Sequence, residues 1–154
     1  MKTRFYAVYL GALTLLLVSS CGSLRAPVFD QYSYQKGTEL KVDALNLMDK
    51  ATMSYDSEKT AIDTFQAELD KMLEYQKNRE NNTISYAMWK MITNPDKNFI
   101  GGFLKRWKEK GTLIGPFITE AKGQVSDALD LILQYEGKKD PVAENKLKAI
   151  LGIQ

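Results

Sequence analysis

Carboxylates are the main side chains in this chain that could do chemistry, because its 154 residues include 19 acidic residues, one cysteine and no histidine. The absence of histidine removes the commonest general base and the commonest zinc ligand. Two spacings, Asp63 to Asp70 and Glu120 to Asp127, place both carboxylates on one helix face, as an oxygen-ligated metal site would require. Solvated helix faces show the same spacing, so we expect no metal site and no cofactor.

Enzymes that rely on carboxylates alone do exist, and glycosidases are the main example. This sequence contains no P-loop and no G-x-S-x-G motif, and no positioned acid–base pair can be identified in it. We therefore expect a non-catalytic protein, and a carboxylate-based enzyme is the least favoured alternative.

The first residues have the order of a secretory signal peptide. Lys2 and Arg4 give a positive start, the segment Phe5–Val18 contains 14 residues without a charge, and small residues then lead to Cys21. A membrane-spanning helix needs ~20 apolar residues, so this segment is too short to cross a bilayer. A core helix would not normally open a chain with two cations, and a cleaved signal is the better interpretation.

The segment Val18-Ser19-Ser20-Cys21 resembles the lipobox of bacterial lipoproteins, in which the cysteine follows the cleavage site. That family favours Leu where this chain has Val18, and Ala or Gly where it has Ser20. The resemblance implies that Cys21 carries a thioether-linked diacylglycerol and becomes the acylated N-terminus, which anchors the protein in the bacterial cell envelope. By the same resemblance, Gly22 rather than Asp at the next position points to the outer membrane.

Three segments follow from this pattern: a lipoprotein signal peptide over residues 1–20, the lipidated cysteine and a flexible tether over 21–37, and a helical domain over 38–154. Within the tether, Pro27 disfavours helix and the apolar residues are too sparse for a core element. The sequence leaves open an alternative in which aromatic side chains of this segment pack along the domain as an ordered strap. Those side chains are Phe29, Tyr32 and Tyr34.

The chain is electrically neutral once the signal is removed. Lys2 and Arg4 are two of its 21 basic residues, so 134 residues remain with 19 charges of each sign. A neutral domain has no overall field to attract nucleic acid, and we expect no nucleic-acid partner. Because Cys21 is the sole cysteine, the fold has no intrachain disulfide and packing has to stabilise its core.

The strongest periodicity is an apolar stripe with a period of about 3.5 residues, which is typical of packed helices. It predicts one long helix over about residues 39–80, with a possible break near Ser54–Ser57, where Asp56 or Ser57 could cap a second helix. The stripe could bind a partner as a coiled coil, but we favour its burial by other helices of the same chain. It consists of Ala44, Met48, Ala51, Tyr55, Ile62, Phe65, Leu69 and Met72.

Turn residues divide the rest of the chain into shorter helices. Asn94-Pro95 ends one of them, because the residue before proline avoids the α region. Gly115-Pro116 and Asp140-Pro141 open two others, since proline is tolerated in a first helical turn. We therefore expect an all-α fold, a helical bundle of four to five helices with one long N-terminal helix, preceded by a flexible tether.

The segment Lys97–Lys110 predicts a basic amphipathic helix with five cations and one anion. Its aromatic side chains fall on one face and most of its cations on the other, which suits a membrane interface. The alternative, which we favour, is a bundle helix whose aromatic face is buried in the core. The candidate contacts to a membrane or a partner are Lys97, Phe99, Phe103, Lys105, Arg106, Trp107 and Lys108.

Gly101-Gly102 interrupts the same segment, although each glycine costs about 1 kcal/mol relative to alanine inside a helix. The close approach of another helix backbone would offset this cost and is the simplest explanation. A kink or hinge is the alternative.

Together these patterns lead us to expect a lipid-anchored, non-catalytic protein of the bacterial cell envelope that acts as a scaffold or interaction module. Its expected partners are the membrane, through the lipid on Cys21, and an envelope protein. The main alternative is a carrier that holds an apolar ligand between its helices. The side chains expected to line such a site are Tyr86, Trp89, Phe99, Phe103, Trp107 and Phe117.

Overall fold

The computed structural model describes residues 29–152, and within this range the regular structure is helical, without a strand. This confirms the predicted all-α bundle. The predicted signal peptide, the lipobox-like segment and Cys21 lie outside the described residues, as do residues 153–154. The α-helices are α2 (Gln31–Asp49), α3 (Lys59–Asn78), α4 (Thr83–Thr93), α5 (Ile100–Lys110), α6 (Gly115–Lys138) and α7 (Pro141–Leu151), and two 3-10 turns, η1 (Lys50–Thr52) and η2 (Tyr55–Glu58), join α2 to α3.

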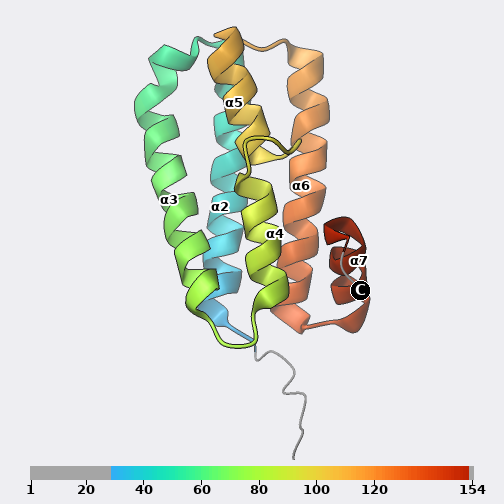
Figure 1. Cartoon of the computed structure of the whole chain (residues 1–154). Helices are drawn as coiled ribbons and strands as arrows, with labels where there is room; N and C mark the ends of the chain where they lie inside the picture. The colour runs from blue at the N-terminus through green and yellow to red at the C-terminus, as the bar shows by residue number, and fades with distance from the viewer. Residues whose placement is uncertain (1–28, 153–154) are drawn as a thin grey trace, which may run out of the picture.

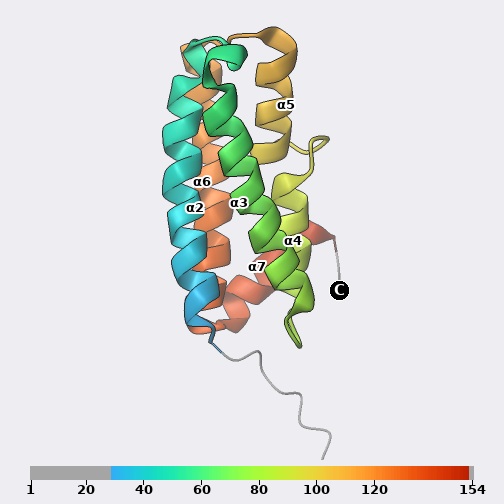
Figure 2. The same ribbon diagram turned by 90° about the vertical axis from the view of Figure 1, so that its left-hand side faces the viewer.

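The helices form four antiparallel columns. Figure 1 shows α2 and α3 running in opposite directions, α4 and α5 stacked end to end as a third column, and α6 returning as the fourth. The last helix, α7, packs against α4 and α6 at the end of the bundle where α2 begins. Figure 2 shows α5 at the other end, near the turn between α2 and α3. No helix within residues 29–152 combines the length and the apolar character needed to cross a membrane.

The predicted long helix is divided into α2 and α3 by the two 3-10 turns. Ser54 caps the second turn, because its side chain accepts a hydrogen bond from the backbone N–H of Ser57 at 3.1 Å. The predicted cap at Asp56 or Ser57 is therefore wrong. The chain reversal brings the stripe residues of α2 to face those of α3, and all eight of them are buried within the chain's own core.

The helical domain begins at Gln31, so the predicted tether is wrong for residues 31–37. Asp30 caps this helix by accepting a hydrogen bond from the backbone N–H of Ser33 at 2.8 Å. The Tyr32 ring packs on the Tyr75 ring of α3, with centroids 4.5 Å apart. A polar segment thus becomes helix because its contacts with α3 supply the stability that its own composition lacks.

The two glycines of α5 permit a tight junction between α4 and α5. A Cβ atom on Gly101 would clash with the carbonyl oxygen of Thr93, and one on Gly102 would clash with the carbonyl oxygen of Lys97. The predicted close backbone approach is confirmed, and the approaching backbone is the end of α4 with the loop that follows it. This contact lets α5 continue the α4 column, which places its aromatic side chains over the core.

Candidate functional site

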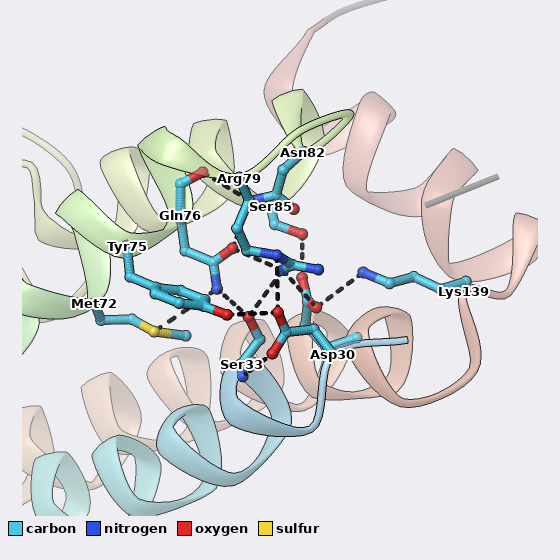
Figure 3. Close-up of polar contacts among 10 residues, drawn as sticks. Asp30, Ser33, Met72, Tyr75, Gln76, Arg79, Asn82, Ser85 and Lys139 are labelled. Carbon is cyan, nitrogen blue, oxygen red and sulfur yellow. Dashed lines mark hydrogen bonds and ion pairs between the residues drawn. The ribbon is translucent and has the colours of Figure 1, made fainter. Parts of the chain in front are cut away.

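Nine polar side chains meet at the end of the bundle where α2 begins, and we call them the N-terminal polar network (Figure 3). They come from the start of α2, the end of α3, the start of α4 and the end of α6, so the network joins all four columns. Its members are Asp30, Ser33, Tyr75, Gln76, Arg79, Asn82, Ser85, Glu136 and Lys139.

Glu136 is the fully buried charge of the network, with 0% of its surface exposed. Its carboxylate accepts hydrogen bonds from the guanidinium of Arg79 at 3.2 Å, from the ammonium of Lys139 at 2.8 Å and from the hydroxyl of Ser85. An isolated carboxylate would be strongly destabilising at such a position, but these three donors compensate for its lost hydration. Glu136 therefore has a structural role in the interior of the bundle.

Asp30 is the second carboxylate of the network. The Tyr75 hydroxyl donates to it at 2.6 Å, and the guanidinium of Arg79 lies 3.1 Å away. Burial opposes its ionisation, but the hydrogen bonds from Tyr75 and Ser33 and the charge of Arg79 outweigh burial and hold the pKa of Asp30 below its usual 3.8. Burial and the bond to Asp30 raise the pKa of Tyr75 to about 12.

Two amide side chains extend the network into the core. The Gln76 amide donates to the Ser33 hydroxyl at 2.8 Å, and the Asn82 amide donates to the backbone carbonyl oxygen of Gln76 at 2.9 Å. A shallow surface hollow of about 450 Å³ is lined by Tyr75 and Arg79 on α3, whereas Glu136 does not line it. The buried carboxylate therefore faces its partners Arg79, Lys139 and Ser85.

The exposed carboxylate pairs of the sequence analysis do not converge. Asp63 forms an ion pair with Lys59 at 2.6 Å, and Asp70, Glu120 and Asp127 are exposed on helix surfaces. Within residues 29–152, no group of three or more histidine, cysteine or acidic side chains is arranged to hold a metal ion.

The candidate contacts in the segment Lys97–Lys110 are separated by the fold into two groups. Phe103 and Trp107 are 4% and 0% exposed, and the indole N–H of Trp107 donates to the carbonyl oxygen of Met53 at 3.1 Å. Phe99 is partly buried against the same core. The cations remain at the surface, where Lys105 pairs with Asp96 and Arg106 stacks on Phe117; these exposed cations are Lys97, Lys105, Arg106 and Lys108.

The aromatic side chains expected to line a carrier site are likewise buried or partly buried. Trp89, Phe103 and Trp107 are buried among other core residues, and Tyr86, Phe99 and Phe117 are partly buried. A hollow of about 220 Å³ lies between α5 and α6, beside Phe99, Phe103 and Phe117. Two larger open grooves lie elsewhere, one of about 610 Å³ between α2 and α3 and one of about 710 Å³ between α2 and α6.

The chain matches no protein family, no curated protein and no solved structure in the comparisons made.

Sequence reasoning missed the N-terminal polar network, although two signals for it were present. Asp30 precedes Ser33 by three residues, which is a common spacing for a helix cap. Glu136 follows Ile132 by four residues, so the apolar stripe of α6 continues onto a carboxylate that has to point inward. A polar residue on a buried helix face was the sign that partners from other helices would converge there.

Proposed function

We propose that this protein is a lipid-anchored, non-catalytic component of the bacterial cell envelope that acts as a scaffold or interaction module. The observation that carries the non-catalytic part is the N-terminal polar network, in which the buried carboxylate of Glu136 is bonded to Arg79, Lys139 and Ser85. A catalytic acid or base has to reach a substrate, and this carboxylate lines none of the hollows described above.

Two observations support the anchoring part of the proposal. One is the lipobox-like segment that ends at Cys21, and the other is the short stretch of chain between Cys21 and the bundle. The described body begins with Phe29 at one end of the bundle, eight residues after Cys21. Eight residues span at most about 29 Å. A lipid on Cys21 would therefore hold this end of the bundle close to a bilayer, and Gly22 favours the outer membrane.

A carrier role has less support. The indole rings of Trp89 and Trp107 and the ring of Phe103 fill the core, so they are not free to line a ligand site. The hollow beside Phe99 and Phe117 has about 220 Å³, whereas sites for small molecules usually have at least about 300 Å³. An interaction module that uses its outer surface is the better interpretation.

Metabolic labelling with a palmitate analogue tests the anchor. Wild type should be labelled and recovered with membranes, and Cys21→Ser should be unlabelled and remain a precursor, because a hydroxyl cannot form the thioether. Ser20→Ala is the matched control, since it keeps the lipobox pattern and should be labelled at least as well as wild type. Equal labelling of wild type and Cys21→Ser would contradict the proposal.

Affinity capture of the native lipidated protein, followed by mass spectrometry, tests the interaction role. Envelope proteins should be recovered with wild type and lost with Cys21→Ser, which should keep the bundle but lack the lipid. Recovery of the protein alone from both strains would contradict a scaffold role.

A further inference from the structure

Exposed aromatic side chains are concentrated at the start of the described chain. Phe29, Tyr32 and Tyr34 are 52%, 48% and 44% exposed, and the other large apolar side chains exposed within residues 29–152 are aliphatic. We call these three residues the aromatic collar. Soluble surfaces carry scattered apolar residues, but three exposed aromatic rings within six consecutive residues concentrate apolar surface at one end of the bundle.

The aromatic collar is held in place by the bundle. Asp30 caps α2 and is fixed in turn by Tyr75 and Arg79, so the N-terminal polar network sets the position of the first turn. The Tyr32 ring packs on Tyr75, while the Phe29 and Tyr34 rings lie 6.4 Å apart. Tyr32 and Tyr34 are therefore presented on the first turn of α2, and Phe29 directly precedes the residue that caps it.

The chemistry around two of these rings suits the boundary between lipid headgroups and hydrocarbon. Phe29 and Tyr34 line one part of the groove of about 710 Å³ between α2 and α6, whose apolar wall includes Val42 and Leu133. Lys138 lies on the same groove and is exposed. Tyrosine rings with an apolar body and a polar hydroxyl, together with a lysine that can reach lipid phosphates, are typical of membrane-interface belts.

We propose that the aromatic collar docks into the headgroup region of the bilayer that carries the lipid on Cys21. The proposal rests on the proposed anchoring, because the eight residues from Cys21 to Phe29 keep the start of the aromatic collar within about 29 Å of the anchor. The second contact fixes the orientation of the bundle on the membrane. It also directs α5, with its exposed cations, away from the bilayer, because α5 lies at the other end of the bundle.

A fluorescence experiment on the full protein in vesicles of phosphatidylethanolamine and phosphatidylglycerol tests this orientation. Lys138→Cys carries an environment-sensitive label beside the aromatic collar, and Lys108→Cys carries the same label on α5 as the matched control. The label at 138 should shift to the blue and be quenched by a lipid-borne quencher, whereas the label at 108 should behave as in water. Equal, water-like behaviour of both labels would overturn the proposal.

Two double variants then test the role of the rings. Phe29→Ser with Tyr34→Ser should abolish the shift at position 138. Met53→Ser with Ile114→Ser removes exposed apolar groups at the other end of the bundle and should leave the shift unchanged. Circular dichroism melts verify that both variants fold. A shift that survives loss of the two rings, or that disappears when Lys105, Arg106 and Lys108 are reversed to Glu, would overturn the proposal.

The mass of the purified protein separates this inference from the proposed function. A mass that includes a diacylglycerol supports the anchor whatever the labels report. If the mass shows no lipid, the anchor fails, and the labelled variants are then mixed with the same vesicles after Cys21→Ser removes the native thiol. A blue shift at 138 alone would still support docking of the aromatic collar, and its absence would overturn it.

Discussion

The guanidinium of Arg79 at the end of α3 lies 3.2 Å from the carboxylate of Glu136 near the end of α6, across 57 residues of chain. Arg79 also reaches Asp30 at the start of α2, at 3.1 Å. One side chain thus connects three helices at the end of the bundle nearest the proposed anchor. Because Glu136 is fully buried, the loss of this partner leaves a poorly compensated charge in the core.

Arg79→Met should therefore lower the free energy of unfolding by about 3 kcal/mol, as measured by urea denaturation. Lys71→Met is the matched control, because Lys71 also pairs with a glutamate but is mostly exposed, and its effect should be small. Combining Arg79→Met with Glu136→Met should cost less than the sum of the two single changes. Strict additivity of the two changes would show that the pair does not interact.

Replacing glycine by alanine should have opposite effects on stability at the junction between α4 and α5 and at an open position inside α6. Gly101→Ala or Gly102→Ala forces a Cβ atom against a backbone carbonyl and should destabilise the fold by at least about 2 kcal/mol. Gly123→Ala, at an open position inside α6, should instead stabilise it by about 0.5–1 kcal/mol. Thermal melts monitored by circular dichroism compare the three. Stabilisation by alanine at all three positions would contradict the close backbone approach.

The two tryptophans differ in their hydrogen bonding, although both are 0% exposed. The indole N–H of Trp107 donates to Met53, whereas that of Trp89 has no acceptor within the described residues. Trp107→Phe should therefore cost about 1 kcal/mol more stability than Trp89→Phe, since it removes the hydrogen bond to the Met53 carbonyl. Both emission spectra should be blue-shifted and unaffected by anionic vesicles. A response of Trp107 to vesicles would show that α5 opens and inserts.

The cap of α2 predicts a loss of stability in acid. Because the folded state lowers the pKa of Asp30 below 3.8, the ionised carboxylate stabilises the fold fully above about pH 4. This contribution is lost as the pH falls through the lowered pKa. The difference in melting temperature between wild type and Asp30→Asn should therefore shrink on acidification below pH 4. A difference that is constant from neutral to strongly acidic pH would refute the proposed role of the charge.

Much of the architecture was determined by the sequence alone, because it depends on local and periodic rules. Helix formers and the stripe from Ala44 to Met72 predict helices with one apolar face, whatever surrounds them. Asn94-Pro95 and Gly115-Pro116 mark helix ends through backbone sterics. The glycine pair in α5 predicts a close backbone contact for the same reason, and the contact is present. These features need no knowledge of distant residues.

Only the tertiary structure decided which polar residues are buried together and where the domain begins. Ser33 and Gln76 are 43 residues apart, and Ser85 and Glu136 are 51 apart, so no local pattern pairs them. The helical state of residues 31–37 depends on the same distant contacts, since the segment lacks a strong apolar stripe of its own. The tertiary structure also decided which way the apolar face of α5 points. Its amphipathic pattern is compatible with a membrane interface but favoured a bundle helix, and the helix packs into the core because its own chain supplies an apolar surface there.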